Sequence, residues 1–339
     1  MIPKNIFITY NDDAHIRKGE IDDIVSVQGV IDTASSVKKA IEENGISPAL
    51  VPLKDDPQTF INTLLKGRPD IIFNLCEGAF GMSSMEMNVA GLYEILNFRY
   101  TGSGPLTLGI CLNKGMTKDI LSAKGIPTSR YAVVSDAGSL SSIDLEFPLI
   151  VKPLKEDAGL GVDNNAVVHN INALRKRVEY VRDIFRQPAI IEEYIDGREF
   201  NVSVIGNENP RALPISEIDF SGLPADMPRL VGYEAKWVAT SLFYEKTVPV
   251  CPADISRDLE EGIKAVAVNA YKSLLCRDYA RIDIRMGLDS IPKVLEVNPN
   301  PDVSPDAGLA RSAKAAGLSY NGLICEIINY AVNRYGYKD

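Results

Sequence analysis

The chain has 339 residues, of which 45% are hydrophobic and 24% are charged, so it is long enough for two or three domains with packed cores. Its formal net charge of −9 argues against a nucleic-acid partner, because such binding needs clustered Lys and Arg side chains. The five cysteines form no C-x-x-C pair, and no stretch resembles a signal peptide or a membrane span. We therefore expect a cytoplasmic protein with small-molecule ligands and no membrane partner.

Patterns typical of strands and helices alternate through the first hundred residues, which predicts a parallel sheet with crossover helices. The expected strands are residues 6–9, 49–53 and 70–76, and the expected helices are residues 31–43, 57–66 and 85–96. Glu77 opens the loop after the third strand, where open α/β sheets bind their ligands. This loop either contacts a ligand or is an ordinary connection between a strand and a helix.

A second unit begins near Asn113, with a helix expected at 114–124 and strands at 131–134 and 148–153. The last strand places the charged Lys152 at the end of an apolar run, and that position requires an explanation. The segment 157–162 follows, and its glycines Gly159 and Gly161 let backbone amides approach a phosphate closely. A glycine loop alone is a weak signal for a nucleotide site.

Acidic residues end the next apolar strand, in the segment 189–200. Glu192, Glu193 and Glu199 could accept hydrogen bonds from an adenine amino group and from ribose hydroxyls, or they could lie on the surface. A third unit then runs from about Ala212 through a polar excursion at 221–247. It continues with a helix at 255–274, an acidic hairpin, and closing helices at 308–316 and 320–335.

The hairpin, residues 281–298, is the most informative segment. Ile282 and Ile284 alternate with polar residues in its first strand, as Leu295 and Val297 do in its second. If the two strands pair, three oxygen-bearing side chains point the same way, and such ligands favour Mg²⁺ carried by substrate phosphates. These side chains are Asp283, Glu296 and Asn298, with Arg281 beside them. The alternative is a hairpin whose charged face is only solvated.

Short motifs along the chain occur in an order that resembles D-alanine–D-alanine ligases of the ATP-grasp superfamily, from about Asn5 to Ala331. The motifs are Phe73-Asn74-Leu75, Tyr100-Thr101-Gly102-Ser103, Leu112-Asn113-Lys114, Gly125-Ile126-Pro127, Val151-Lys152-Pro153, Tyr233-Glu234-Ala235-Lys236, Cys251-Pro252-Ala253, Arg281-Ile282-Asp283 and Leu295-Glu296-Val297-Asn298. The resemblance implies an α/β protein with α+β lobes, that is, an ATP-grasp fold with an N-terminal Rossmann-like parallel-sheet domain. The implied domains are 1–112 (N-terminal), 113–207 (central ATP-grasp lobe) and 208–339 (C-terminal ATP-grasp lobe with the catalytic site).

The resemblance also implies roles for individual residues around ATP. Lys114 and Lys152 would bind phosphates, and Lys236 would reach the terminal phosphates. The remaining nucleotide contacts would come from the adenine-edge residues Glu192 and Ile195, the ribose residue Glu199, the neighbouring Glu193 and Tyr194, and the loop residues Ala158, Gly159 and Gly161. A homodimer through the N-terminal domain is implied as well.

The implied catalytic centre holds two Mg²⁺ ions, with Mn²⁺ as an alternative, on Asp283, Glu296 and Asn298. A carboxylate would attack the γ-phosphoryl group to give an acylphosphate and ADP, and an amine would then attack the acylphosphate. Arg281 would face the reacting carboxyl group. Together with a backbone amide near Asp302 it would stabilise the tetrahedral oxyanion.

Several positions depart from the family pattern in the region that binds the substrates. Ala158 stands where the family has a serine in the glycine loop, and Trp237 stands where it has a tyrosine. Ala307 replaces a serine that holds the acceptor's carboxylate, and Asp302 replaces a glycine. The family's glutamate on the first loop has no clear counterpart, and the candidates are Glu20, Asp22 and Asp23.

From these departures we expect an ATP-dependent carboxylate–amine ligase whose substrates are amino acids or a short peptide other than two D-alanines. The expected substrate contacts are Glu77, Trp237, Asp302, Ser304 and Ala307. Two alternatives stay open. The chain could be a true D-alanine–D-alanine ligase that orients its substrates through other residues, or a nucleotide-binding protein without ligase chemistry.

Overall fold

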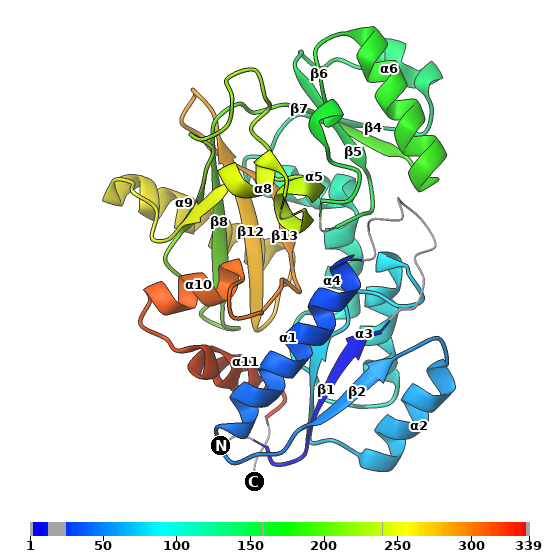
Figure 1. Cartoon of the computed structure of the whole chain (residues 1–339), viewed down its shortest axis with the longest axis vertical. Coiled ribbons are helices and arrows are strands. Elements are labelled where there is room, and N and C mark those ends of the chain that lie inside the picture. Colours follow the sequence, from blue (N-terminus) through cyan, green and yellow to red (C-terminus); the bar gives the residue numbers. More distant parts are fainter. Residues whose placement is uncertain (1–2, 13–24, 158, 239, 337–339) are drawn as a thin grey trace.

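The fold was analysed in a computed structural model that describes residues 3–12, 25–157, 159–238 and 240–336. Side chains are described for these residues apart from 25–28, 141–142, 236 and 237. The chain forms three units, each with its own sheet. Figure 1 shows the N-terminal unit at one end of the molecule and the two other units side by side at the opposite end.

The N-terminal unit is built on a parallel sheet of three strands in the order β2-β1-β3. The strands are β1 (Ile6–Asn11), β2 (Ala49–Leu53) and β3 (Ile71–Leu75), and the helices are α1 (Val25–Glu42), α2 (Pro57–Gly67), α3 (Glu86–Ile95) and α4 (Pro105–Leu112). Successive side chains of a strand point to opposite faces. Ile6 and Ile8 accordingly pack with α1, whereas Phe7 packs with α2 and α3. Helices therefore cover both faces, as the alternating pattern predicted.

The central lobe is an antiparallel sheet in the order β4-β7-β5-β6, preceded by α5 (Lys114–Ala123). Its strands are β4 (Tyr131–Val134), β5 (Leu149–Pro153), β6 (Val167–Val168) and β7 (Ala189–Glu193). Helix α6 (Ile171–Tyr180) and the helical turn Val181–Phe185 pack on this sheet in one apolar cluster. Asn113 caps α5 by accepting a hydrogen bond from the backbone N–H of Met116 at 3.2 Å, which fixes where the helix begins.

The C-terminal lobe contains a larger antiparallel sheet in the order β11-β10-β8-β12-β13, with β9 attached to β8. Its strands are β8 (Arg198–Ile205), β9 (Arg211–Ala212), β10 (Ser216–Asp219), β11 (Val248–Val250), β12 (Tyr279–Met286) and β13 (Pro292–Asn298). Its helices are α7 (Tyr233–Trp237), α8 (Leu242–Lys246), α9 (Arg257–Ser273), α10 (Gly308–Ala315) and α11 (Tyr320–Arg334). Helix α9 packs on the apolar face of β8, β12 and β13. The polar face is thereby left for the site.

One buried carboxylate joins the N-terminal unit to the C-terminal lobe. Asp278 is completely buried and accepts hydrogen bonds from Gly102 N at 2.8 Å, Asn207 Nδ2 at 2.9 Å and Arg334 Nη2 at 2.9 Å. Arg334 also donates to the backbone oxygen of Tyr100 at 2.8 Å. A shared apolar core adds to this link, because α10 and α11 pack against α1 and the strands of the first sheet. Figure 1 shows α11 beside α1.

Most expected elements are confirmed, and the differences are local. Helix α1 begins at Val25 rather than at residue 31, and the polar excursion at 221–247 contains the short helices α7 and α8. The helices α4 and α6 were not expected. Strand β8 lies before the expected lobe border at 207/208 but pairs with β10 and β12 of the C-terminal sheet. Among the described residues, no helix is long and apolar enough to cross a membrane.

Candidate active site

Two cavities meet between the units. The small cavity, of about 150 Å³, lies between the central lobe and the polar face of the C-terminal sheet, and Lys114, Lys152, Glu192 and Arg285 are among its lining residues. The large cavity, of about 1210 Å³, is lined by all three units, for example by Glu77, Asp157 and Asp302. Arg281 and Glu296 line both cavities and therefore mark where they join.

A buried carboxylate at the base of the small cavity is held by two lysines. Glu192 Oε1 lies 3.0 Å from Lys152 Nζ, and Glu192 Oε2 lies 2.8 Å from Lys118 Nζ. Ser129 Oγ donates to Oε2 at 2.6 Å. Burial alone would raise the pKa of Glu192, but Lys118 and Lys152 outweigh it and hold that pKa far below its ordinary value. The carboxylate is therefore ionised, which explains why Lys152 ends an apolar strand.

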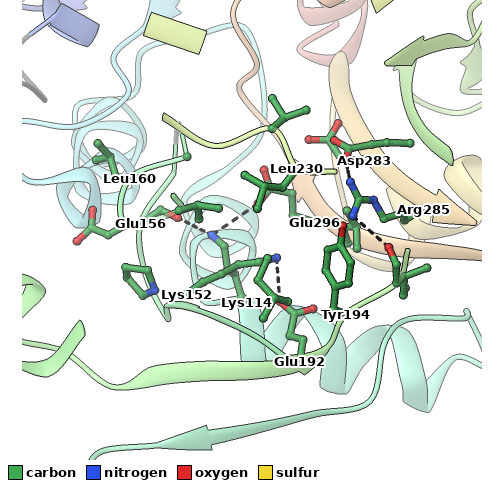
Figure 2. A pocket seen from close by; sticks show the side chains of 18 of the residues that line it. Lys114, Lys152, Glu156, Leu160, Glu192, Tyr194, Leu230, Asp283, Arg285 and Glu296 are labelled. Carbon is green, nitrogen blue, oxygen red and sulfur yellow. Dashed lines mark hydrogen bonds and ion pairs between the residues drawn. The ribbon is translucent and has the colours of Figure 1, made fainter. Parts of the chain in front are cut away.

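Lys114, the first residue of α5, connects this end of the cavity to the hairpin. Its Nζ donates to the backbone oxygen of Glu156 and lies 3.7 Å from Glu296 Oε2 and 3.8 Å from Asp157 Oδ1. Burial lowers the pKa of Lys114, but the surrounding carboxylates, led by that of Glu296, raise it above its ordinary value. Figure 2 shows Lys114 and Lys152 together, with Glu156, Glu192 and Glu296 around their amino groups. A phosphate entering here would meet two lysine amino groups.

The opposite end of the small cavity holds a second paired acid. Arg285 Nη2 donates to Glu199 Oε2 at 2.6 Å, and Arg285 Nη1 donates to the backbone oxygen of Ile195 at 3.1 Å. Tyr194 lies under the Arg285 guanidinium, 5.5 Å from ring centroid to Cζ. Glu193, in contrast, pairs with the half-exposed Arg130 at 2.9 Å. Glu199 is therefore fixed in orientation by Arg285, a residue that the sequence analysis did not select.

The glycine loop closes over the small cavity from the central lobe. Gly159 and Gly161 have φ of +81° and +70°, which side-chain-bearing residues rarely adopt. A Cβ on Gly159 would also lie 3.1 Å from the backbone of Gly232 and Tyr233, at the start of α7. Only glycine permits this close approach. Ala158 lies outside the described residues, as do the side chains of Lys236 and Trp237 on α7.

The hairpin places its oxygen ligands as the alternation predicted. Asp283 pairs with Glu296 and Arg281 pairs with Asn298 across β12 and β13, so these four side chains share one face. In this structure the Asp283 carboxylate accepts hydrogen bonds from protein side chains. Arg281 donates to it at 2.8 and 2.9 Å, and Asn201 donates at 2.7 Å. Burial would lower the pKa of Arg281, but Asp283 raises it above its usual range, so the guanidinium stays charged.

The chemistry of this donor set fits a hard divalent cation. Two carboxylates and an amide oxygen are the ligands that Mg²⁺ prefers, and no thiol or imidazole is among them. Within the described part of the chain, no three His, Cys, Asp or Glu side chains come close enough together to hold a metal by themselves. Asp283, Glu296 and Asn298 would therefore hold a cation that also takes oxygen ligands from elsewhere, such as phosphate groups.

The expected substrate contacts that the structure describes all line the large cavity: Glu77, Asp302, Ser304 and Ala307. The carboxylate of Asp302 folds back on its own loop, where it accepts from Ser304 N at 2.8 Å and from Ser304 Oγ at 2.9 Å. Thr33 on α1 lies 3.4 Å from the same carboxylate. The candidate acids Glu20, Asp22 and Asp23 lie outside the described residues.

Comparisons with known proteins point in one direction. The model of the family described as D-ala D-ala ligase C-terminus matches residues 120–329. A protein of Sinorhizobium fredii called uncharacterized protein y4sG is 32% identical over 310 residues, which cover 89% of this chain and 88% of that protein. The D-alanine–D-alanine ligase of Carboxydothermus hydrogenoformans is 30% identical over 305 residues, which cover 87% of this chain and 91% of that enzyme.

Solved structures agree in fold. A crystal structure of the D-alanine–D-alanine ligase from Bacillus anthracis complexed with ATP has a TM-score of 0.73 and 24% sequence identity, over 98% of this chain and 99% of that chain. A structure of the ligase from Coxiella burnetii gives a TM-score of 0.72 at 18% identity. The expected ATP-grasp architecture, with its parallel N-terminal sheet, is thereby confirmed.

Proposed function

The chain belongs to the D-alanine–D-alanine ligase family and is an ATP-grasp ligase, and from this premise we propose that it joins an amino acid or a short peptide to an amine, with substrates other than two D-alanines. The observation that carries the proposal is the meeting of the two cavities at Arg281 and Glu296. A nucleotide in the small cavity would present its γ-phosphoryl group there, next to a carboxylate that enters from the large cavity. Phosphoryl transfer requires this in-line arrangement.

Residues along the small cavity would contact each part of ATP. Lys114 and Lys152 would bind phosphates, and Lys236 would reach the terminal phosphates from α7. Lys118 and Ser129 contact Oε2 of Glu192, whereas the buried Oε1 lies 3.0 Å from Lys152 Nζ and accepts no hydrogen bond from the described residues, so Oε1 would accept from the adenine amino group. The backbone of Ile195 would contact the adenine edge, next to Glu193 and Tyr194. Glu199 would accept hydrogen bonds from the ribose. Backbone amides of the loop with Ala158, Gly159 and Gly161 would cover the phosphates.

Asp283, Glu296 and Asn298 would hold Mg²⁺, as two ions, with Mn²⁺ as an alternative. Bound there, the metal would neutralise charge that develops on the transferred phosphoryl group. In this structure Asp283 accepts two hydrogen bonds from Arg281 and one from Asn201, which leaves one of about four lone-pair sites for a metal. Arg281 lines both cavities and would face the reacting carboxyl group where they join.

The reaction we propose has two steps. A substrate carboxylate oxygen attacks the γ-phosphorus, the bond to ADP breaks, and an acylphosphate forms. An amine then attacks the acyl carbon, loses a proton, and expels phosphate as the amide bond forms. Arg281 and a backbone amide near Asp302 would stabilise the tetrahedral oxyanion, and the loss of one such donor typically costs about 10²–10³ in rate.

The departures in the large cavity support substrates other than two D-alanines. Ala307 lacks the hydroxyl that would hold an acceptor's carboxylate, and the carboxylate of Asp302 occupies the loop where the family has glycine. A site that loses hydrogen-bond donors accepts a different set of ligands. The identity of 30% to a D-alanine–D-alanine ligase favours the second candidate, a genuine D-alanine–D-alanine ligase.

Phosphate release separates these candidates. The protein would be incubated with ATP, Mg²⁺ and pools of D- and L-amino acids and dipeptides, followed by mass identification of the product. We expect phosphate release with a pool that lacks D-alanine. Release with D-alanine alone would establish the second candidate, and the absence of release with every pool would contradict a ligase function.

We also propose that the protein works in the cytoplasm as a homodimer through its N-terminal unit. All five cysteines are free, and Cys76, Cys111 and Cys276 are buried, as expected in a reducing compartment. Ile95 on α3 and Leu106 on α4 are 83% and 63% exposed, which supports an interface on this unit. Sedimentation of a variant with both replaced by Ser would test the dimer.

A further inference from the structure

A buried carboxylate that the proposed reaction has not yet used faces the large cavity. Glu86, the first residue of α3, is 8% exposed and lines this cavity together with Arg281 and Asn298. From the described residues its carboxylate accepts one hydrogen bond, donated by Asn300 Nδ2 at 3.0 Å. In the described part of the chain, no Lys or Arg forms an ion pair with it, whereas the buried Glu192 has two lysines.

The position of Glu86 is fixed relative to the metal ligands. The Asn300 side chain that donates to Glu86 also donates to Cys76 O at 3.2 Å and accepts from Tyr279 Oη at 2.9 Å. The backbone N–H of the same residue donates to Asn298 Oδ1 at 3.0 Å. Asn300 is therefore held by four hydrogen bonds, and it links the Glu86 carboxylate to Asn298, which lies two residues before Asn300 in the chain.

The electrostatic environment of Glu86 calls for a positive charge. Burial raises the pKa of Glu86 well above its ordinary value, and the nearby Asp157 and Glu77 raise it further. Eight acidic and four basic side chains line the large cavity in the described part of the chain. Of the four basic residues, Arg281 already lies on Asp283. A cationic group bound next to Glu86 would replace the water that burial has removed from the carboxylate.

We propose that Glu86 binds the α-ammonium group of the amino acid whose carboxyl group is phosphorylated. The inference rests on the ligase function proposed above and names the residue that would contact the amino group of its substrate. In such a substrate the ammonium and carboxyl groups are attached to one carbon. A substrate carboxyl at Arg281 would thus place its ammonium group in the same cavity that Glu86 and Asn300 line.

The test traps the acylphosphate with hydroxylamine, so that no knowledge of the natural amine is needed. Hydroxylamine attacks the acyl carbon, phosphate leaves, and a hydroxamate forms that can be measured by its colour with iron. Each D- and L-amino acid that the wild-type protein accepts would be compared with the same acid lacking its amino group. Glu86→Gln keeps the shape of the side chain and removes the charge, and Glu86→Asp keeps the charge.

We expect Glu86→Gln to raise KM for the amino acid by roughly 10- to 100-fold, because a hydrogen bond between charged groups is lost. KM for the deaminated acid should stay the same, and Glu86→Asp should recover part of the affinity. Glu94→Gln, at the other end of α3 and hydrogen-bonded to Tyr100 outside both cavities, is the matched control and should change neither value. The Tm of Glu86→Gln should not fall, because the amide keeps the shape of the side chain and costs no more to bury than the carboxyl group.

Four results would overturn the inference. The first is an unchanged KM for the amino acid in Glu86→Gln. The second is an equal rise in KM for the amino acid and for the deaminated acid in Glu86→Gln, together with a lower Tm. Glu86 would then be a structural support for Asn300. The third is a changed Mg²⁺ requirement at constant KM, which would make the occupant a metal ion. The fourth is a wild-type preference for deaminated acids, which would leave the ligase function intact. If no carboxylate yields a hydroxamate, the ligase function fails as well.

Discussion

Most acidic side chains of the small cavity lie against cations, whereas in the large cavity the carboxylate of Glu86 has an amide group, and no cation among the described residues, as its partner. Glu192 contacts two lysines, Glu199 contacts Arg285, and Asp283 contacts Arg281. Paired charges hold their side chains in one orientation before a ligand arrives, and this preorganisation reduces the entropy cost of binding. A buried carboxylate without a cation would gain its counter-charge from the ligand. The small cavity is thus preorganised, whereas by the inference above the large one would be completed by its substrate.

The largest effect on activity is expected from substitutions in the hairpin, where the two cavities join. Replacing Glu296 or Asn298 by Ala should lower ADP formation by about 10³-fold or more, because metal binding supplies several kcal/mol of transition-state stabilisation. The fold should survive, since both side chains are polar and line a cavity. Asp289→Ala, at the exposed turn of the same hairpin, is the control and should be fully active. Near-normal ADP formation by Glu296→Ala would contradict the metal assignment.

Arg281 should show the next largest effect. Arg281→Met is expected to lower kcat by about 10²–10³ through the loss of a donor to the developing oxyanion. The Kd for ATP, measured by calorimetry, should change much less, because Lys114, Lys152 and Glu192 are left intact. Arg211→Met, which removes a surface pair with Glu326, provides the comparison. If kcat changed only a few-fold, Arg281 would serve only to hold Asp283.

A substitution of Lys152 tests the nucleotide-binding role of the small cavity alone. Lys152→Met should raise the Kd for ATP by roughly 10- to 100-fold, because a charged donor to phosphate is lost. It should also reduce thermal stability, since Glu192 would keep only Lys118 as a cationic partner. Lys264→Met, on the surface of α9, should affect neither quantity. An unchanged ATP affinity would remove Lys152 from the nucleotide site.

The smallest expected effect is a dependence of protein stability on pH, caused by the ionisation of Glu192. Its pKa is depressed in the folded protein, so its contribution to stability is fully present above the ordinary value of 4.5 and is lost as the pH falls from there towards the folded pKa. The difference in free energy of unfolding between wild type and Glu192→Gln should therefore shrink by up to about 1.4 kcal/mol per pH unit below 4.5. Urea denaturation at pH 6, 5, 4 and 3.5 measures this, and a constant difference would show that the pairs with Lys118 and Lys152 are weak.

The sequence was a good guide wherever local periodicity decides the structure. The face that Asp283, Glu296 and Asn298 share follows from strand alternation and the short turn between their strands. The order of strands and helices in the N-terminal unit follows in the same way. Helix α4 was missed even though Gly104-Pro105 is a usual start signal, with proline at the first helical position. Its short apolar sequence lacks the periodicity that marks a surface helix.

Contacts between distant residues could not be predicted in this way. Glu86 and Asn300 are separated by 214 positions, and Ser129 and Glu192 by 63. Lys118 looks like an ordinary polar residue of a helix until the fold buries it against Glu192. The pairing of Arg281 with Asp283 is a further case, because alternation predicts that they share a face but not that they bind each other. Positions were therefore predictable, whereas partners required the assembled fold.

The fully buried Asp278 has a consequence for how the molecule can be divided or recombined. Its hydrogen bonds reach the N-terminal unit through Gly102, the adjoining loop through Asn207, and the last helix through Arg334. In a fragment that began at α5, Asp278 would lack the backbone N–H of Gly102, and Arg334 would lack the backbone oxygen of Tyr100. A chimera whose N-terminal unit came from another protein would lack the same hydrogen bonds unless that unit supplied an equivalent backbone amide. The N-terminal unit and the C-terminal lobe are therefore coupled through one buried carboxylate, and neither can be exchanged without supplying its hydrogen-bond partners.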